Sequence, residues 1–526
     1  MTPSHPDHTD IVIGAGSTGA VIAARLSEHA DRRVLLIEAG PDYPDPAELP
    51  APLRNGLYPA IGTHDWGYTA EAVPGRTIGF PRGKVVGGTS AINVSLAMRP
   101  EPLDFEAWTK VGNEGWTWED VLPYYVKLED DQDFGDQPVP EGRPRLHGAG
   151  GPIPIWRWQD AQLTPQQKAL QEAAKRLGFP EVADHNAPGA LGVGPLPQNL
   201  VDGQRISTAI GYLAAARSRP NLTIRANTTV DRILFEGTRA VGVRVVTDGV
   251  AEELYADRIT LSAGTVATPA ILLRSGIGAP ERLAELGVAP VAELPGVGEN
   301  FLDHCTNLLS LQLRPGVYDE ATPVTQMLLQ FTAPGSAEFA DMQLYVFSHV
   351  DLNGYGSWVK EPLGTDRAMM FSVGLELPRS VGHVTIDSTD PEAKPIVVAN
   401  YLQDPEDLRK MREGLRLCWE LARQPEFRLL TTGNVWPGAE VLRSDEVLDE
   451  FLQKTVITHF HPVGTAKMGP ADDPTAVVDD RCRVHGTTNL RVADASVMPV
   501  MVRSNTNLTC IMIGERVADW LLDETN

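Results

Sequence analysis

The sequence predicts an α/β fold, with a parallel sheet near the N-terminus and an antiparallel sheet with helices in the centre of the chain. Residues 10–38 read as strand, glycine-rich turn, helix and strand in succession, which is typical of a parallel sheet. Residues 308–314, 342–347 and 383–387 alternate between apolar and polar side chains, as half-buried antiparallel strands do. Two domains of different architecture are therefore expected.

Composition excludes several classes of function. The chain has 526 residues, of which 69 are acidic and 45 basic, giving a formal net charge of −24. Phosphate binding needs a surface rich in Lys and Arg, so this charge argues against nucleic acid and against anionic lipid as partners. Hydrophobic residues make up 42% of the chain, which is typical of a globular protein.

The N-terminus and the cysteines favour a reducing compartment. Residues 1–10 are polar and lack the basic and apolar regions of a secretory signal. No apolar run reaches the roughly 18 residues of a membrane span. The four cysteines form no CxxC pair and are too few for a disulfide framework. We therefore predict a cytoplasmic protein. Cys482 and His485 have no second ligand pair at zinc spacing, so no metal site is predicted.

The first strand and its turn predict a dinucleotide cofactor. The strand ends at Gly14, and Gly16 and Gly19 complete a GxGxxG pattern. Gly14 permits the tight turn, Gly16 lets the backbone approach a pyrophosphate, and Gly19 lets the next helix pack on the strand. Glu38 ends the second strand, where a carboxylate accepts hydrogen bonds from ribose hydroxyls. This motif alone is compatible with either FAD or NAD(P).

Further motifs follow in a fixed order. They are Gly87-Gly88-Thr89-Ser90, Ala263-Gly264 with Thr268-Pro269, Leu294 to Gly298 with Asp303-His304, and His461 with Asn505. With these motifs the chain resembles the glucose–methanol–choline (GMC) oxidoreductases, a family of FAD-dependent alcohol oxidases and dehydrogenases, over nearly its whole length. Bacterial hydroxymethylfurfural and aryl-alcohol oxidases and choline-dehydrogenase-like enzymes share this outline.

The resemblance implies a set of FAD-binding residues. They are Gly14, Ala15, Gly16, Ser17, Thr18, Gly19, Glu38, Ala39, Val86, Gly87, Gly88, Asn93, Val94, Val230, Ala263, Asp494, Ala495, Asn505 and Thr506. Some relatives attach FAD covalently through a histidine placed just before the asparagine that Asn93 matches. Ile92 stands at that place, so we expect noncovalent FAD.

The same resemblance places the catalytic base at His461 and its partner at Asn505. An alcohol becomes a good hydride donor once its hydroxyl proton leaves, and a histidine of pKa ~6.5 suits that task. We expect His461 to take this proton while hydride moves to flavin N5, and Asn505 to hydrogen-bond the substrate oxygen. Asp303-His304 is interpreted as a structural turn.

The substrate pocket is predicted less directly. His459 lies two residues before His461, so in an extended segment both side chains point the same way. We expect it to line the pocket. The alternatives are that it tunes His461, binds a polar substrate, takes part in catalysis itself, or is a histidine satisfied by backbone or water. The pocket candidates are Phe331, Tyr345, Phe347, Trp358, Met370, Phe371, His459 and Phe460. Their aromatic character favours an aromatic or apolar primary alcohol, and no cage for a quaternary ammonium group is evident.

The motifs imply that the FAD-binding domain is discontinuous. We place this Rossmann-like domain at 8–155, 222–305 and 462–526, and the substrate domain, with its antiparallel sheet and helices, at 156–221 and 306–461. The predicted function is oxidation of a primary alcohol to the aldehyde, with the flavin reoxidised by O2 or another acceptor. The alternatives are a flavin-binding hydroxynitrile lyase without net redox chemistry, a choline-type dehydrogenase, and an NAD(P) dehydrogenase.

Overall fold

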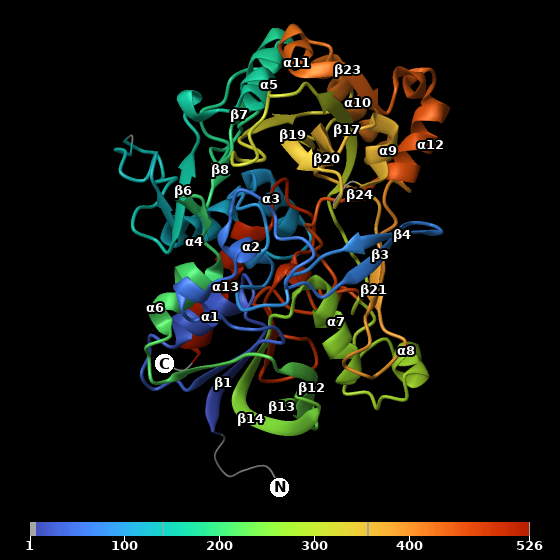
Figure 1. Ribbon diagram of the computed structural model, residues 1–526. Coiled ribbons are helices and arrows are strands. Elements are labelled where there is room, and N and C mark those ends of the chain that lie inside the picture. The colour runs from blue at the N-terminus through green and yellow to red at the C-terminus, as the bar shows by residue number, and fades with distance from the viewer. Residues whose placement is uncertain (1–6, 140, 355–356, 525–526) are drawn as a thin grey trace.

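The first large sheet contains the predicted N-terminal strand–helix–strand unit. The computed structural model describes residues 7–139, 141–354 and 357–524 (Figure 1). Part of this sheet is parallel and part is antiparallel. The strand at residues 8–13 pairs in parallel with those at 34–37 and 250–261. The strands at 239–247 and 229–236 extend the sheet by antiparallel pairing. In spatial order its strands are β11 (Leu222–Arg225), β2 (Val34–Ile37), β1 (His8–Ile13), β14 (Val250–Leu261), β13 (Arg239–Thr247) and β12 (Thr229–Glu236), with β25 (Leu490–Val492) also beside β14.

Helices pack against this sheet, and two of them begin just after its strands. Helix α1 (Gly19–Leu26) follows the glycine turn and packs against α13 (Asn507–Asp523), near the end of the chain. Helix α7 (Gly264–Arg274) begins directly after β14. Strand β2 and nearly all of α1 are buried, because a parallel sheet is covered on both faces.

The second large sheet is antiparallel. Its spatial order is β23 (Thr431–Trp436), β17 (Cys305–Leu313), β20 (Arg367–Leu375), β19 (Met342–Asp351), β18 (Met327–Phe331) and β7 (Gly192–Pro195), with β24 (Ile457–Thr458) also paired to β17. Helices α5 (Pro165–Arg176) and α10 (Pro405–Ala422) pack on this sheet. Asp404 caps α10 by accepting a hydrogen bond from the Glu406 amide, and Pro405 occupies the first turn.

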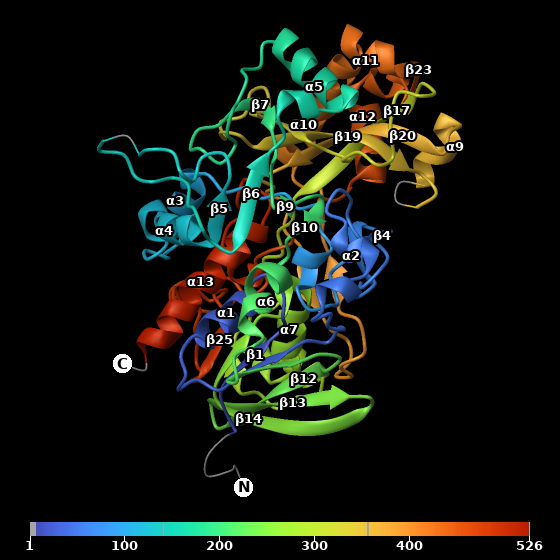
Figure 2. The same cartoon turned by 60° about the vertical axis from the view of Figure 1, so that its left-hand side comes forward.

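Figures 1 and 2 show the two large sheets at opposite ends of the molecule. The predicted α/β class, with one mainly parallel and one antiparallel sheet, is confirmed. One strand prediction needs correction. Residues 383–387 do not join the central sheet, because β21 (His383–Thr385) belongs to a separate sheet with β22 (Ile396–Val398), β3 (Tyr68–Val73) and β4 (Arg76–Phe80).

The remaining elements are short or peripheral. The other helices are α2 (Ala51–Arg54), α3 (Pro102–Lys110), α4 (Trp118–Leu128), α6 (Ala214–Ala216), α8 (Pro280–Glu285), α9 (Lys360–Leu363), α11 (Pro425–Leu430) and α12 (Asp445–Thr455). The other strands are β5 (Glu129–Asp131), β6 (Ile153–Arg157), β8 (Pro197–Gln198), β9 (Leu200–Val201), β10 (Gln204–Arg205), β15 (Ile277–Gly278) and β16 (Ala292–Glu293). Within the described ranges, no helix has the length and apolarity needed to cross a bilayer.

Two hydrophobic cores correspond to the two large sheets. The core of the first sheet also includes Tyr212 and Leu213, which lie inside the predicted range 156–221 of the second domain. The core of the second sheet also includes Tyr68 and Phe80 from the predicted first domain. The domain ranges therefore stay a prediction. At these two segments, residues assigned to one domain pack in the hydrophobic core of the other.

Candidate active site

A cavity of about 610 Å³ lies between the two large sheets and contains most of the predicted site. Residues of the glycine turn, including Gly14 and Gly16, line part of it, and His461 and Asn505 line another part. Strands β17, β19 and β20 of the second sheet contribute further lining. The cavity therefore joins the predicted nucleotide site to the predicted catalytic pair.

The glycine turn has the geometry that a pyrophosphate requires. Gly14 has φ +93°, and a Cβ there would lie 2.4 Å from the Ser262 carbonyl oxygen. Helix α1 begins without a side-chain cap, so its first N–H groups suit phosphate oxygens. The Glu38 carboxylate accepts from the Ala15 amide at 3.0 Å and from the Gly40 amide at 2.9 Å, and it lines the cavity.

Most of the predicted cofactor residues line this cavity. They are Gly14, Gly16, Ser17, Thr18, Glu38, Ala39, Gly88, Asn93, Val94, Val230, Ala263, Asp494, Ala495, Asn505 and Thr506. Ala15, Gly19, Val86 and Gly87 do not line it, and all four are buried. At Gly19 the start of α1 packs closely on the glycine turn, because a Cβ there would lie 2.0 Å from the Gly14 carbonyl oxygen.

The donor set and the close backbone approaches fit FAD. Asp494 accepts from the Gly264 amide at 2.8 Å and from the Thr268 hydroxyl at 2.7 Å, which fixes the N-terminus of α7 beside the cavity. Gly88 packs directly on Gly16, since a Cβ on Gly88 would lie 2.6 Å from Gly16 Cα. Both glycines line the cavity, so a phosphate-linked ligand can approach their main chain with no side chain in between.

His461 contacts Asn505 through one ring nitrogen and His304 through the other. Asn505 Nδ2 lies 3.0 Å from His461 Nε2, and Asn505 Oδ1 accepts from the Tyr345 hydroxyl at 3.3 Å. His461 Nδ1 lies 2.9 Å from His304 Nδ1, and His304 Nε2 lies 2.9 Å from the Val502 carbonyl oxygen.

These partners fix which nitrogen of His461 is the base. A carbonyl oxygen only accepts hydrogen bonds, so His304 Nε2 must be the N–H that Val502 receives. A neutral His304 then accepts at Nδ1 from His461 Nδ1–H. The remaining nitrogen, His461 Nε2, has the ring's lone pair, which accepts from the Asn505 amide group in this structure. It can take a substrate proton when Asn505 donates to the substrate oxygen instead.

The backbone around His461 is held by a buried carboxylate. Asp303 accepts from the His461 amide at 2.8 Å, from the Thr458 hydroxyl at 2.7 Å and from the Tyr401 hydroxyl. Burial raises the pKa of Asp303, and the hydrogen bonds from Tyr401 and Thr458 oppose that shift. Phe460, just before His461, has φ +69°, a strained conformation for a non-glycine residue that tends to occur at functional sites.

The surroundings keep His461 unprotonated. Burial lowers the pKa of its imidazole well below the usual value, and electrostatic repulsion by the neighbouring basic groups His304, His459 and Arg82 lowers it further. A neutral imidazole is the form that can accept a proton from an alcohol. The site therefore presents a base at His461 Nε2.

The second sheet supplies an apolar wall with a period of two residues. Cavity-lining positions alternate over part of each strand, since successive side chains point to opposite faces. These alternating positions are Thr306 and Leu308 on β17, Tyr345 and Phe347 on β19, and Met370 and Ser372 on β20. Beyond an irregularity in β19, the consecutive residues 349–351 and Arg367 on β20 also line the cavity. His459 and Phe460 also line the cavity, and the His459 ring centroid lies 5.1 Å from that of His461 and 5.4 Å from that of Tyr345.

Three pocket candidates lie elsewhere, and their prediction is corrected here. Phe371 lies between Met370 and Ser372, so it points to the opposite face of β20, where it packs on Phe427 at a centroid distance of 4.9 Å. Phe331 packs on Phe179 in the same core. Trp358 is 43% exposed and does not line the cavity.

Comparison with known proteins agrees with this geometry. Sequence models of GMC oxidoreductases match residues 8–306 and 378–514. A GMC-type oxidoreductase of Rhodococcus erythropolis is 38% identical over 98% of this chain and 99% of its own length. The chain belongs to the GMC oxidoreductase family. It is therefore an FAD-dependent alcohol oxidoreductase, as the motifs predicted, and the family assignment displaces the NAD(P) alternative.

Two further relatives extend the comparison. An oxygen-dependent choline dehydrogenase of Escherichia coli K12 is 37% identical over 97% of this chain and 95% of its own length. The crystal structure of pyridoxine 4-oxidase from Mesorbium loti is 31% identical and superposes with a TM-score of 0.88, covering 98% of this chain and 99% of the other.

Sequence reasoning missed three groups of this GMC oxidoreductase site. Asp303 and His304, interpreted as a structural turn, contact His461 directly. Glu376 is fully buried, with Oε2 3.2 Å from His304 Nδ1. The adjacency of an acid and a histidine at the start of β17 was a usable signal for the first two, whereas nothing local to Glu376 marks it.

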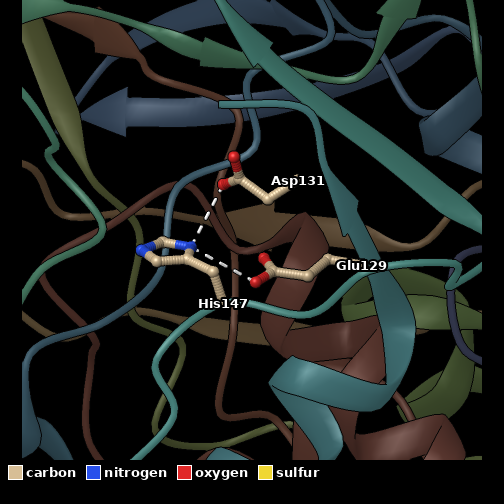
Figure 3. A group of neighbouring side chains, drawn as sticks. All are labelled: Glu129, Asp131 and His147. Carbon is tan, nitrogen blue, oxygen red and sulfur yellow. Dashed lines mark ion pairs between the residues drawn. The ribbon is translucent and has the colours of Figure 1, made fainter. Parts of the chain in front are cut away.

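A second cluster of ionisable residues lies outside the cavity of this oxidoreductase. His147 Nδ1 lies 3.1 Å from Asp131 Oδ2 and 3.3 Å from Glu129 Oε1, and all three side chains are nearly buried (Figure 3). The three groups converge closely enough to resemble a metal site.

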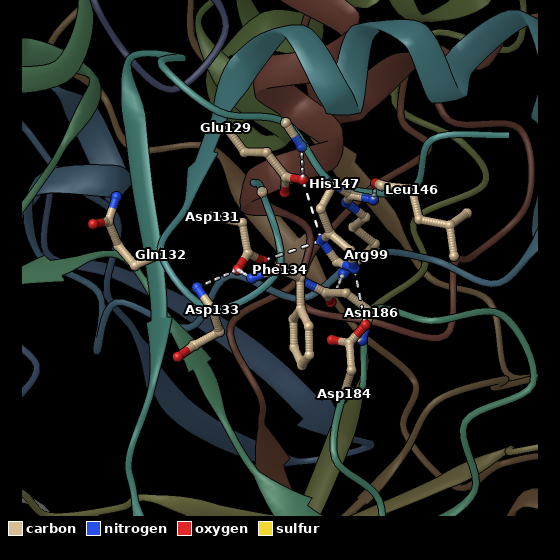
Figure 4. A network of polar contacts seen from close by, with 12 residues as sticks. Arg99, Glu129, Asp131, Gln132, Asp133, Phe134, Leu146, His147, Asp184 and Asn186 are labelled. Carbon is tan, nitrogen blue, oxygen red and sulfur yellow. Dashed lines mark hydrogen bonds and ion pairs between the residues drawn. The ribbon is translucent and has the colours of Figure 1, made fainter. Parts of the chain in front are cut away.

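The charges around this cluster argue instead for an ion-pair network. Arg99 contacts Glu129, and Asp184 lies 3.0 Å from His147 Nε2 (Figure 4). Arg157 lies 3.0 Å from Asp131. Burial lowers the pKa of His147, but hydrogen bonds with Asp131, Asp184 and Glu129 outweigh it and raise that pKa to about 10. A divalent cation would have to compete with these three positive side chains.

This network predicts a pH-dependent stability. Because the folded-state pKa of His147 exceeds 6.5, its stabilising contribution is complete below about pH 6.5 and is lost as the pH rises through about 10. We expect the contribution to fall by up to about 3 kcal/mol between pH 7 and pH 10. The melting temperature of wild type should therefore exceed that of His147→Gln most at pH 7, and the gap should narrow toward pH 10. A gap that is constant over this range would contradict the assignment.

Proposed function

We propose that this enzyme oxidises a neutral, apolar primary alcohol, with aromatic alcohols favoured, to the aldehyde, using noncovalently bound FAD. The observation that supports this most strongly is the arrangement of His461 Nε2 and Asn505 in one cavity with the glycine turn and an apolar wall. A base, a hydrogen-bond donor and a redox cofactor are the three components that hydride transfer from an alcohol requires.

The residues divide the work as follows. His461 Nε2 takes the hydroxyl proton of the alcohol. Asn505 Nδ2, 3.0 Å from that nitrogen, donates to the alcohol oxygen as negative charge develops there, a contribution of about 3 kcal/mol in comparable oxyanion sites. Tyr345 orients the Asn505 amide through its hydroxyl. Bound FAD supplies the acceptor for the hydride that leaves the alcohol carbon.

The cofactor is held without a covalent bond in this proposal. Ile92 lines the cavity just before Asn93, and its aliphatic side chain cannot bond to a flavin. The turn at Gly14 and Gly16, together with Glu38, would hold the ADP half, and Gly88, Asn93 and Asp494 would contact the remainder.

The charge distribution of the wall favours a neutral substrate. The alternating wall positions on β17, β19 and β20 are apolar or hydroxyl-bearing, and the end of β19 and the start of β20 add His349, Asp351 and Arg367. The cavity-lining carboxylate on these strands is Asp351, which is exposed at the end of β19 and lies 3.9 Å from Arg367. A quaternary ammonium substrate would need a buried carboxylate or an aromatic cage against it, so the choline-type alternative is less favoured.

Anaerobic mixing with benzyl alcohol tests this proposal. We expect the flavin absorbance near about 450 nm to bleach, and choline at equal concentration to bleach it more slowly. Persistent yellow colour with every alcohol tried, together with release of cyanide from mandelonitrile, would support the lyase alternative. Admitting air and measuring peroxide then distinguishes O2 from another electron acceptor.

A further inference from the structure

A buried carboxylate lies behind the catalytic pair, on the side away from Asn505. Glu376 follows β20 and is 0% exposed. Its Oε2 lies 3.2 Å from His304 Nδ1, and its Oε1 lies 3.8 Å from His459 Nδ1. Within the described part of the chain, neither oxygen has a conventional hydrogen-bond donor. A buried carboxylate without donors is unfavourable unless it serves as a counter-charge.

The backbone is shaped to admit this arrangement. A Cβ on Gly374 would lie 2.9 Å from His459 Nδ1 and 3.1 Å from Glu376 Oε1. Because Gly374 has no side chain, the Glu376 carboxylate and the His459 ring can both occupy the space beside it. The Glu376 amide also donates to the Asp341 carbonyl oxygen at 2.9 Å, which fixes the residue at the end of its strand.

We propose that Glu376 is the counter-charge that allows the His461–His304 pair to hold the proton taken from the substrate. The inference rests on the proposed function, since it concerns where the alcohol proton goes. Glu376 is a positioning residue, because it acts through His304.

The proton balance is simple. The alcohol O–H bond breaks and an N–H bond forms at His461 Nε2, which gives the histidine pair one positive charge. His461 Nδ1–H can then pass its proton to His304 Nδ1, 2.9 Å away. His304 then has N–H groups on both nitrogens, one facing the Val502 carbonyl and one facing Glu376.

Proton uptake turns a repulsive contact into an attractive one. With His304 neutral, the lone pair on Nδ1 faces a carboxylate oxygen at 3.2 Å. With His304 protonated, the same contact is a charge-assisted hydrogen bond. Burial lowers the pKa of His304, and the Glu376 charge opposes that shift. The carboxylate therefore makes the pair a stronger base than burial alone would allow.

Other charged and titratable groups surround the pair. They are Arg82 after β4, Asp303 at the start of β17, Tyr345 on β19, Tyr401 after β22, and His459 after β24. Asp303 accepts hydrogen bonds from Thr458 and Tyr401, and Arg82 donates to the Phe460 carbonyl oxygen at 3.0 Å. Glu376 differs from Asp303 because it has no such donors among the residues that the structure describes.

Nitrogen NMR of the holoenzyme tests the proposal without turnover. With 15N-labelled histidine rings, assigned through the signals lost in His461→Gln, the pH midpoint for proton uptake by the pair is measured directly. We expect Glu376→Gln to lower that midpoint by about one pH unit or more, since it removes an adjacent negative charge. Glu376→Asp, which restores the charge at a longer distance, should recover part of the shift. The control Glu361→Gln changes an exposed residue of α9 and should leave the midpoint unchanged.

Flavin reduction by benzyl alcohol gives the second readout. The anaerobic reduction rate should rise with pH to a plateau, and the midpoint of that rise should lie at lower pH in Glu376→Gln. The plateau rate should fall roughly 10-fold because the base is weaker. KM should change little. Equal NMR midpoints in wild type and Glu376→Gln, or superimposable pH profiles, would overturn the role of Glu376 and leave the proposed function intact. If wild type reduces no flavin with any alcohol, the proposed function fails, and the NMR midpoints still decide the role of Glu376.

Discussion

Replacing His461 with alanine should slow flavin reduction by roughly 100-fold or more while leaving FAD bound. His461 Nε2 is the unprotonated ring nitrogen, because Val502 and His304 together place the ring proton on Nδ1, and its lone pair accepts from Asn505 Nδ2. Without it, the alcohol must lose its proton to water. Stopped-flow bleaching of the flavin under anaerobic conditions measures the rate, and the ratio of flavin to protein absorbance measures retention.

The matched control is His29→Ala, because His29 is exposed on the first domain, outside the cavity. It should reduce flavin at the wild-type rate. A near-normal rate in His461→Ala would reject the assignment of this residue as the base. A colourless His461→Ala protein would instead show that the imidazole is needed to hold the cofactor.

The nucleotide-binding half of the site could be predicted from the sequence because its causes are local. The close approach of Gly19 to the Gly14 carbonyl, at 2.0 Å for a hypothetical Cβ, is set within the six consecutive residues 14–19 and their turn. Glu38 follows on the adjacent strand, so its distance from the turn is fixed by the parallel pairing of β1 and β2. Each constraint is visible in a short stretch of residues.

The wall of the pocket could be predicted only in part, because both faces of the second sheet are apolar. Alternation identified β17 and β19 as strands, yet Met370 and Phe371 are equally hydrophobic and lie on opposite faces. Which face meets the cavity depends on where helices α5 and α10 pack, and that is a tertiary property. A shift of one residue therefore separates a pocket side chain from a core side chain.

The histidine cluster is the part that the sequence could least predict. His304 and His461 are far apart in the chain and meet because β24 pairs with β17. Glu376 enters the cluster from a third segment, after β20. No local pattern links these residues, so their contact follows from strand order alone.

Substituting Gly88 with alanine should reduce FAD retention by about 10-fold or more. Gly88 has φ +52°, and a Cβ there would lie 2.6 Å from Gly16 Cα. Both partners in this contact are backbone, so no flexible side chain can move aside. The turn that holds the pyrophosphate must then shift, and the phosphate-binding N–H groups of α1 shift with it.

The control for Gly88→Ala is Gly237→Ala. It introduces the same backbone strain from a positive φ without the steric contact of the new Cβ. Gly237 has φ +61°, close to that of Gly88, but a Cβ there would meet nothing within 4 Å. Both substitutions place alanine in the left-handed region, at a shared cost of roughly 1–2 kcal/mol. The flavin-to-protein absorbance ratio of the purified proteins should fall in Gly88→Ala and stay at the wild-type value in Gly237→Ala. Equal retention in the two variants would mean that the approach of Gly88 to Gly16 does not shape the cofactor site.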